Sequence, residues 1–285
     1  MKNIGSIQNI NRILKENELF AKKKFGQNFL VDQNILQRIV EVSEINSNVN
    51  VIEIGPGLGS LTEYLCQKAN KVLCYEIDQD MIDLLEKNLE YDNYQILHKD
   101  ILKANVNEDI ATYFDDKPVF LVANLPYYIT TPIILKLLEE TNRIKKYTMM
   151  MQYEVAMRIT SKPNVKDYNA LSILIAYKAM ATKALDVPRT VFIPAPNVDS
   201  AVVVLDLYDK PRVIVKNEDF FLKLIKGAFA QRRKTLINNL MQMNIPKEKT
   251  LLALEKMNLD KAIRSEALSI EEFARLSDIL LEMEV

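Results

Sequence analysis

Apolar runs that alternate with helical stretches are the feature that most constrains the fold of this chain. Most of the segments between these runs contain helical patterns of ten or more residues, in which the apolar side chains are spaced as on one face of a helix. Such alternation is typical of a doubly wound parallel sheet, because parallel strands need the crossovers that helices provide. The strand-like runs are Val51–Ile54, Val72–Tyr75, Tyr94–Leu97, Val119–Ala123 and Tyr147–Met151.

The second half of the chain changes character. The pattern is helical over Asn169–Met180, and Ala201–Leu205 predicts a final strand that closes the sheet. Beyond Pro211 strand signals fade and helical periodicity dominates. We therefore expect an α/β domain over residues 1–209, which begins with a basic helical segment, and a small helical domain over residues 210–285.

Basic side chains are concentrated in two regions, although the net charge of the whole chain is only -1. Residues 1–30 hold six Lys and Arg against two Glu, and residues 210–264 hold thirteen against five Asp and Glu. Charge segregated in this way favours contact with a polyanion, whereas the alternative is an ordinary solvated helix face. The residues that we predict to contact RNA are Lys22, Lys23, Lys24, Arg232, Arg233 and Lys234.

Composition excludes several kinds of site. With one histidine, His98, and two cysteines, Cys66 and Cys74, the chain lacks the residues for a multi-histidine metal site, a disulfide scaffold or a histidine-based triad. We therefore expect no metal, and chemistry that uses amides, carboxylates, hydroxyls or a cofactor. Residues 1–10 show no secretory signal, and the uncharged stretch 118–135 is interrupted by polar residues and prolines, which predicts a cytoplasmic protein without a membrane anchor.

Three of the six glycines, Gly55, Gly57 and Gly59, follow the first strand within five positions. A glycine-rich turn between a strand and a helix turns its N–H groups toward a ligand, and Glu76, at the end of the second strand, can accept hydrogen bonds from ribose hydroxyls. Asp100, after the third strand, is placed either to accept from an adenine amine or to cap the following helix. These features fit S-adenosylmethionine or a dinucleotide and do not decide between the two.

The fourth strand runs into Asn124-Leu125-Pro126-Tyr127. Pro126 favours an extended Leu125, so the carbonyls of this turn are held rigid. If Asn124 Oδ1 and the carbonyl of Leu125 or Pro126 accept the two N–H bonds of an aromatic amine, the nitrogen becomes pyramidal and can attack a sulfonium methyl group. Tyr127 would stack on the base, and Phe192 would close its other face unless it is an ordinary core residue.

The chain resembles the ribosomal RNA adenine N6,N6-dimethyltransferases from about Lys22 to Leu240. The matching blocks, in family order, are 25–30 (FGQNFL), 53–59 (EIGPGLG), 124–127 (NLPY), 151–156 (MQYEVA), 192–201 (FIPAPNVDSA) and 229–236 (FAQRRKTL). The last block resembles the branch that acts on the small ribosomal subunit. Two positions depart from the family pattern, Lys99 where glycine is usual and Tyr128 where asparagine is common.

The resemblance implies a Rossmann-like methyltransferase with a seven-stranded, mostly parallel sheet whose last strand is antiparallel. It also implies that S-adenosyl-L-methionine binds through Asn28, Leu30, Gly55, Gly57, Glu76, Asp100 and Asn124, and that methyl transfer uses Asn124, Leu125, Pro126, Tyr127 and Phe192. The implied substrate is a pair of adjacent adenosines in the 3′-terminal hairpin loop of small-subunit (16S) ribosomal RNA, modified by a monomer on the immature subunit. The alternatives are dimethylation of large-subunit (23S) RNA and a non-catalytic RNA-binding assembly factor.

Overall fold

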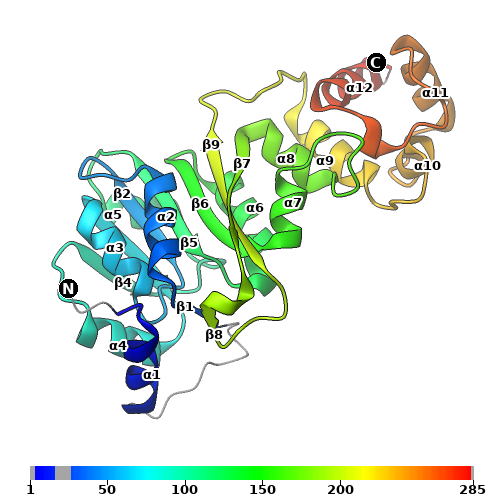
Figure 1. Cartoon of the computed structure of the whole chain (residues 1–285). Coiled ribbons are helices and arrows are strands. Elements are labelled where there is room, and N and C mark those ends of the chain that lie inside the picture. The colour runs from blue at the N-terminus through cyan, green and yellow to red at the C-terminus, as the bar shows by residue number, and fades with distance from the viewer. Residues whose placement is uncertain (1–3, 17–26, 284–285) are drawn as a thin grey trace. The chain divides into compact units, whose positions relative to one another are not determined.

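The computed structural model describes residues 4–16 and 27–283, so the predicted basic turn Lys22-Lys23-Lys24 lies outside the described residues. Its larger sheet has seven strands in the order β4-β3-β2-β5-β6-β9-β7 (Figure 1). The pairs from β4 to β6 are parallel, and β9 is antiparallel to β6. The strands are β2 (Asn50–Ile54), β3 (Lys71–Glu76), β4 (Tyr94–His98), β5 (Val119–Asn124), β6 (Ile144–Gln152), β7 (Ala179–Val187) and β9 (Ser200–Leu207).

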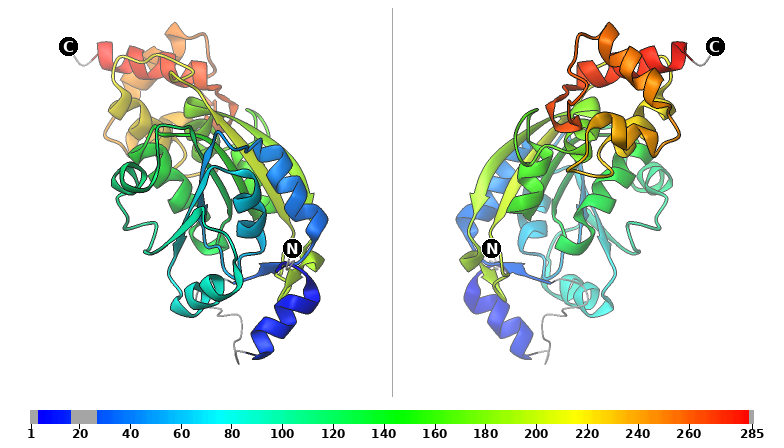
Figure 2. Two further views of the ribbon diagram at one scale, coloured as in Figure 1. Left: turned by 90° about the vertical axis from the view of Figure 1, so that its left-hand side faces the viewer. Right: turned by 90° about the vertical axis from the view of Figure 1, so that its right-hand side faces the viewer.

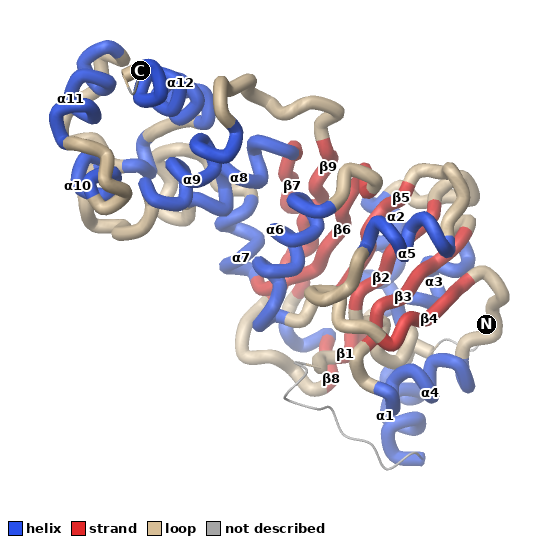
Figure 3. The backbone as a smooth tube through the Cα atoms, turned by 180° about the vertical axis from the view of Figure 1, so that it is seen from behind, coloured by secondary structure: helices blue, strands red, loops and turns tan. Residues whose placement is uncertain are grey.

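Helices cover both faces of this sheet, so the predicted fold class is confirmed. Helices α2 and α3 pack against each other on one face, and α5 and α6 pack together on the other (Figures 1 and 3). Because it is covered from both sides, β2 is buried along its whole length. The helices of this part are α2 (Gln33–Ser43), α3 (Ser60–Lys68), α4 (Gln79–Asn88), α5 (Val106–Tyr113), α6 (Thr130–Glu140) and α7 (Tyr153–Ile159).

The chain reverses its direction of winding at β2. From β2 it proceeds outward to β3 and β4 on one side, and β5 and β6 extend the sheet on the other. The carboxyl ends of β2 and β5 therefore diverge into loops on opposite sides, which leaves a crevice where ligands bind in open α/β sheets. The glycine-rich turn follows β2 and Asn124 ends β5, so both predicted motifs lie at this crevice.

The C-terminal part of the sheet corrects two predictions. The helix predicted over Asn169–Met180 ends at Lys178, as α8 (Ala170–Lys178), and the chain continues directly into β7. Strand β7 is the edge of the sheet, and β9 lies between it and β6, so the last strand does not close the sheet. Strand β7 has the sequence AMATKALDV, and alanine and lysine are helix formers, so pairing with β9 overrides the local propensity.

A second, two-stranded sheet ties the N-terminal region to the segment before β9. Strand β1 (Phe29–Leu30) pairs antiparallel with β8 (Phe192–Ile193), and Leu30 is in register with Phe192. The Val31 N–H extends the ladder by donating to the Val191 carbonyl over 2.9 Å. Figure 2 shows the blue N-terminal segment, which begins with helix α1 (Ile7–Glu16), meeting the yellow-green β8 loop.

The chain divides into two compact units. One comprises Met1–Ala156 and Thr182–Asp206, and the other comprises Met157–Ala181 and Leu207–Val285. After Asp206 the chain enters the second unit for good, close to the predicted boundary at residue 209. Sequence periodicity did not indicate that residues 157–181 belong with the helical unit. They do so because α8 packs on α9, with the rings of Tyr177 and Phe221 5.1 Å apart.

The second unit is helical, as predicted. Its core is formed by apolar faces of the four C-terminal helices together with Ile173 and Tyr177 of α8. None of the helices among residues 4–16 and 27–283 combines the length and the apolar character needed to cross a bilayer. The C-terminal helices are α9 (Glu218–Ala228), α10 (Leu236–Met241), α11 (Lys247–Lys256) and α12 (Ile270–Glu282).

Gly59 and Gly55 offer a matched pair for testing the glycine turn. Both have positive φ, but a Cβ at Gly59 would lie 2.3 Å from Cδ1 of the fully buried Leu85, whereas the nearest atom at Gly55 is 4.0 Å away. We expect Gly55→Ala to lower the free energy of unfolding by about 1 kcal/mol and Gly59→Ala by about 3 kcal/mol, since only the second adds overpacking to backbone strain. Urea denaturation without cofactor measures both values, and equal losses would contradict this account.

Candidate functional site

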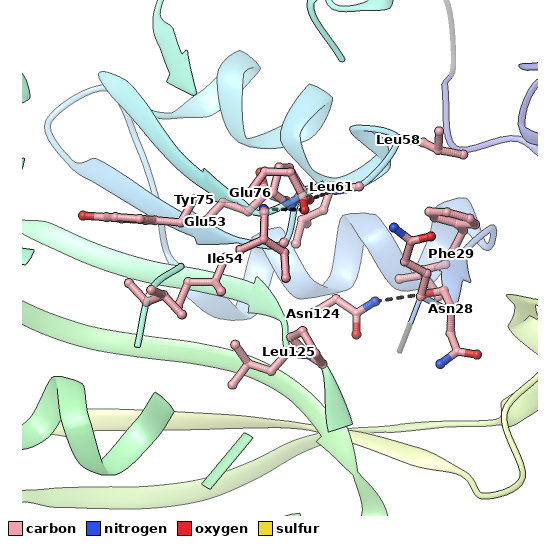
Figure 4. Close-up of a pocket in the computed structure, with 18 of the residues that line it drawn as sticks. Asn28, Phe29, Glu53, Ile54, Leu58, Leu61, Tyr75, Glu76, Asn124 and Leu125 are labelled. Carbon is pink, nitrogen blue, oxygen red and sulfur yellow. Dashed lines mark hydrogen bonds between the residues drawn. The ribbon is translucent and has the colours of Figure 1, made fainter. Parts of the chain in front are cut away.

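A cavity opens at the crevice between the carboxyl ends of β2, β3, β4 and β5. Its empty volume is about 1030 Å³, open solvent at its mouth included, and small-molecule sites typically occupy roughly 300–1,000 Å³. Figure 4 shows side chains from the N-terminal segment and from three strands converging on it. The predicted residues that line it are Asn28, Leu30, Gly55, Gly57, Glu76, Asp100, Asn124, Leu125, Pro126 and Tyr127.

The Glu76 carboxylate is fixed beside the glycine turn. Its Oε2 accepts from the Gly57 N–H over 3.3 Å, and its Oε1 accepts from the N–H groups of Ile77 at 2.8 Å and Asp78 at 3.0 Å. Burial raises the pKa of Glu76, while these backbone donors act in the opposite direction. A carboxylate has about four acceptor sites, so Glu76 keeps capacity for a ligand hydroxyl while its orientation is fixed.

Asp100 does not cap a helix, because the residues after it form a turn and the next helix, α5, begins at Val106 with Asn105 as its N-cap. Its Oδ1 accepts from the Leu102 N–H over 2.9 Å within this turn. The residue also lines the cavity, and its Oδ2 lies 3.9 Å from the Lys103 ammonium group. The turn engages one oxygen and therefore does not prevent the other from accepting a hydrogen bond from a ligand amine.

Lys99, one of the two departures from the family pattern, also lines the cavity. Its Nζ lies 2.6 Å from Asp109 Oδ1, and the Tyr75 hydroxyl donates to Asp109 Oδ2 over 3.0 Å. Asp109 is buried, so two donors compensate a carboxylate that has little access to water. This network fixes the backbone immediately before Asp100. Sequence reasoning noted Lys99 only as an exception, because no local pattern joins it to Asp109, which lies ten residues on in α5.

The Asn124 amide is oriented by the N-terminal segment. Its Nδ2 donates to the Asn28 carbonyl over 3.4 Å, as the dashed line in Figure 4 shows. This assignment places Oδ1 on the other side of the amide, and no donor among the described residues bonds to it. The atom that the sequence predicted as an acceptor is therefore available, because the amide nitrogen is engaged elsewhere.

The two carbonyls that the sequence offered as a second acceptor differ in the structure. The Pro126 carbonyl already accepts from the Ile129 N–H at 3.2 Å and from the Thr130 hydroxyl at 3.0 Å. No donor within the described part of the chain bonds to the Leu125 carbonyl, while the Leu125 N–H donates to Met150 of the neighbouring strand β6. The geometry thus favours Leu125 over Pro126 as the partner of Asn124.

The two predicted stacking residues lie in different surroundings. Tyr127 lines the cavity, and its hydroxyl forms a 2.6 Å hydrogen bond with Ser200 Oγ. Phe192 is only 3% exposed, packs in the core cluster that contains Leu30, and does not line the cavity. The structure therefore brings Tyr127 to the site and does not bring Phe192 there, and the stacking role of Phe192 stays a prediction.

The N-terminal segment covers the glycine turn. A Cβ on Gly57 would lie 3.3 Å from Phe29 Cε1, so this ring approaches the turn closely. Gln27, which sequence reasoning did not select, lines the cavity and donates through Nε2 to Asp78 Oδ2 over 2.9 Å. Its position next to Asn28 in the block FGQNFL was the available signal.

A buried acid lies behind the glycine turn. Glu53 is 2% exposed, lines the cavity and accepts from the Cys74 thiol over 3.7 Å. Burial, assisted by the nearby Glu76 carboxylate, raises the pKa of Glu53 to about 8.

Burial also raises the pKa values of the Cys66 and Cys74 thiols, so these cysteines are protonated and reduced rather than reactive. Among the described residues, no group of three or more acids, histidines and cysteines suits a metal ion.

The second unit carries the predicted C-terminal cations. Arg232, Arg233 and Lys234 are exposed in the loop between α9 and α10. A separate hollow in this unit is lined by Arg232 and Arg233 together with Lys166, Arg264 and Glu266. The Arg232 guanidinium donates to the Lys166 carbonyl, which brings two segments distant in sequence to one cationic surface. Sequence reasoning identified the arginine pair but missed Lys166 and Arg264, because only the fold gathers them.

Comparison with known proteins agrees with this architecture. The profile of the family described as "Ribosomal RNA adenine dimethylase" matches residues 19–282. A solved dimethyladenosine transferase from Plasmodium falciparum is 29% identical with a TM-score of 0.72, covering 90% of this chain and 97% of that one. The 23S rRNA methyltransferase ErmE is 27% identical with a TM-score of 0.68, covering 89% of this chain and 99% of that one.

The fold and the site therefore define a Rossmann-like methyltransferase. More specifically, the chain belongs to the family of ribosomal RNA adenine dimethylases, which confirms the family and enzyme class predicted from the sequence blocks. Proteins named "Ribosomal RNA small subunit methyltransferase A" from Bacillus pumilus and Streptococcus thermophilus are each 49% identical to it. These matches cover 98% and 95% of both chains respectively, and they confirm the small-subunit branch.

The raised pKa of Glu53 predicts a specific pH dependence of stability. In the unfolded chain Glu53 loses its proton near pH 4.5, whereas in the folded protein it keeps the proton up to about pH 8. Its contribution to stability is therefore complete below pH 4.5 and is lost as the pH rises toward 8, by up to about 1.4 kcal/mol per pH unit.

We expect Glu53→Gln to remove this dependence, since glutamine does not ionise. Relative to wild type, the variant should gain stability steadily as the pH is raised from 5.5 to 8, measured by urea denaturation at each pH. Glu86→Gln, at an exposed glutamate on α4, is the control and should show no such trend. A Glu53→Gln difference that is constant across this range would contradict the assignment.

Proposed function

We propose that this protein transfers methyl groups from S-adenosyl-L-methionine to N6 of two adjacent adenosines in the 3′-terminal hairpin loop of small-subunit (16S) ribosomal RNA, giving N6,N6-dimethyladenosines. The observation that carries the proposal is the Asn124 amide, whose Nδ2 is engaged by Asn28 while Oδ1 and the Leu125 carbonyl are left as acceptors. The near full-length similarity to proteins named small subunit methyltransferase A supports the choice of RNA.

The residues around the cavity fit the cofactor. Glu76 offers a fixed carboxylate for ribose hydroxyls, Asp100 an oxygen for the adenine amine, and the turn at Gly55 and Gly57 the close backbone approach that a bulky ligand needs. When bound, S-adenosylmethionine supplies a methyl group on a positively charged sulfur, and the N–C bond forms as the S–C bond breaks. Asn28 and Leu30 are proposed to contact it from the N-terminal segment.

The chain activates the adenosine by hydrogen bonding. The lone pair of an N6 amine is delocalised into the purine ring, which makes the amine a poor nucleophile. Acceptance of its two N–H bonds by Asn124 Oδ1 and the Leu125 carbonyl holds the nitrogen pyramidal, and these rigid acceptors also stabilise the positive charge that develops on it. The methylated nitrogen then loses one proton to solvent and becomes a neutral amine. Tyr127, held by Ser200, is proposed to stack on the base. No histidine takes part, since His98 does not line the cavity.

The monomethylated product of the first transfer has one N–H left. A single acceptor then suffices to orient the amine, which is consistent with two successive transfers at one site.

We also infer that the protein works as a cytoplasmic monomer on the immature small subunit. Its basic loop Arg232-Arg233-Lys234, together with Lys166 and Arg264, is proposed to contact RNA phosphates. Lys22, Lys23 and Lys24 are proposed to do the same at the N-terminal end.

A large-subunit RNA target is the second candidate, because ErmE shares the fold at 27% identity. The higher identity of the small-subunit relatives favours the first candidate. Mass spectrometry of both ribosomal RNAs from a strain lacking this gene distinguishes the two. We expect dimethyladenosine to disappear from small-subunit RNA, whereas its loss from large-subunit RNA alone would refute the proposal.

Replacement of the amide tests the chemistry. We expect Asn124→Ala to lower the rate constant for methyl transfer at least a hundredfold, because one of two preorganised acceptors is removed. Binding of RNA should be unchanged, measured by filter binding beside transfer of labelled methyl groups to small subunits. Asn70→Ala, outside the cavity, is the matched control. Unchanged methyl transfer by Asn124→Ala would rule out the amide mechanism, and a wild-type protein without transfer would favour an assembly factor.

The basic loop gives a separate test. We expect Arg232→Ala with Arg233→Ala to weaken RNA binding and to reduce the slope of log K against log[salt] by about 1 to 2 units, since fewer counterions are released. Lys247→Ala with Lys249→Ala removes the same charge from the start of α11, where Lys247 is exposed and Lys249 is half-buried, and should leave the slope nearly unchanged. Equal effects of the two double variants would show that net charge, not this surface, determines binding.

A further inference from the structure

A second hollow lies beside the methyl-transfer site in the same unit. It is lined by residues 152–154, by Arg189 and by residues 197–199, and its empty volume is about 950 Å³, open solvent included. These residues come from the end of β6, the start of α7 and the loop that leads into β9. We call it the Tyr153 hollow. None of its lining residues belongs to the cavity that the cofactor would occupy.

The Tyr153 hollow adjoins Tyr127 through direct contacts. Strand β6 is the neighbour of β5, and it continues to Gln152, which pairs with Ser200 of β9. The Ser200 hydroxyl contacts the Tyr127 hydroxyl at 2.6 Å, and the Tyr153 N–H donates to the Asp199 carbonyl over 3.0 Å. An RNA strand that delivers one base to Tyr127 therefore passes next to the hollow.

The hollow exposes apolar surface that a folded protein normally covers. Tyr153 is 40% exposed and Val198 is 44% exposed, and the rest of the lining carries two amides, Arg189 and the carboxylates of Glu154 and Asp199. The Lys183 ammonium group lies 5.0 Å from the centroid of the Tyr153 ring and is held by Asp186 at 2.6 Å. A cation over one face of an aromatic ring anchors the ring, so the opposite face of Tyr153 is the one that can take a flat partner.

The polar lining suits a nucleobase. Gln152 and Asn197 carry side-chain amides, which pair with the edge of adenine through its N6 and N7. Arg189 donates through its guanidinium to the Asn197 carbonyl over 3.2 Å, and its backbone N–H donates to Asp199. A guanidinium at the rim provides positive charge for a phosphate of the same nucleotide. An aromatic platform flanked by amides and a cation is the combination that single-stranded RNA readers use.

We propose that the Tyr153 hollow is a second base site, in which the nucleotide adjacent to the adenosine being methylated stacks on the Tyr153 ring. The inference rests on the proposed function, in which two neighbouring adenosines are modified in turn, so that one base lies beside the site while the other reacts. When the target adenosine leaves the loop, the base next to it loses a stacking partner. The hollow provides a replacement for that stacking and fixes the register of the strand.

The test uses the full-length protein and small subunits that lack the modification. We expect Tyr153→Ala to raise KM for the subunits about tenfold, with kcat and the affinity for the cofactor unchanged, because a stacking platform contributes binding rather than chemistry. Tyr153→Trp, which keeps a flat ring, should restore KM to within about twofold of wild type. Tyr208→Ala removes a similarly exposed tyrosine from the other unit and should leave KM unchanged.

A spectroscopic arm reports stacking directly. 2-Aminopurine replaces each of the two adenosines of a hairpin RNA in turn. At the position next to the target, its fluorescence should fall when the RNA binds wild type and should not fall with Tyr153→Ala. A KM within twofold of wild type for Tyr153→Ala, or quenching that is insensitive to this substitution, would overturn the second base site. Failure of the proposed function is a separate outcome, since wild type would then form no dimethyladenosine in small-subunit RNA.

Discussion

The hydrogen bond from Asn124 Nδ2 to the Asn28 carbonyl determines which end of the Asn124 amide remains an acceptor toward the cavity. An amide has one accepting end and one donating end, and only the accepting end can draw a proton-bearing amine into a reactive geometry. The Asn124 nitrogen donates to the main chain of a distant segment, so the accepting oxygen is the end left for a ligand before any ligand binds. In the proposed mechanism the position of residue 28 therefore matters as much as residue 124.

Backbone hydrogen bonds perform a similar function elsewhere in the site. The Pro126 carbonyl is taken up by the first turn of the following helix, which leaves Leu125 as the neighbouring acceptor. The Glu76 carboxylate is oriented by three N–H groups of its own loop and the glycine turn. In each case the main chain, rather than a second catalytic side chain, determines what a functional group can do. Because none of these contacts needs an imidazole group, such a site can be built in a chain that has one histidine.

The sequence predicted those parts of the fold and site that depend on local patterns. Short runs of residues reveal the buried strands, the glycine turn, Glu76 and the motif at residues 124–127. The structure brings the last three together at the carboxyl ends of the inner strands. Strand β7 was missed because an edge strand with three alanines and a lysine among its nine residues has no apolar run. Gln27 and Lys166 were missed because their partners lie 51 and 66 residues away along the chain. Lys99 was missed because its partner Asp109 lies in the following helix, and no local pattern joins the two. The choice between Leu125 and Pro126 required the positions of hydrogen-bond donors, which no spacing rule provides.

The small sheet of β1 and β8 has a mechanical consequence. It joins the segment that covers the glycine turn to the loop that carries Phe192, through paired backbones at Phe29–Leu30 and Phe192–Ile193 and the added bond from Val31. A displacement of either segment must break this ladder or carry the other segment along. Release of a ligand that requires the N-terminal segment to move would therefore displace the loop that carries Phe192 as well, because the ladder couples the two segments mechanically.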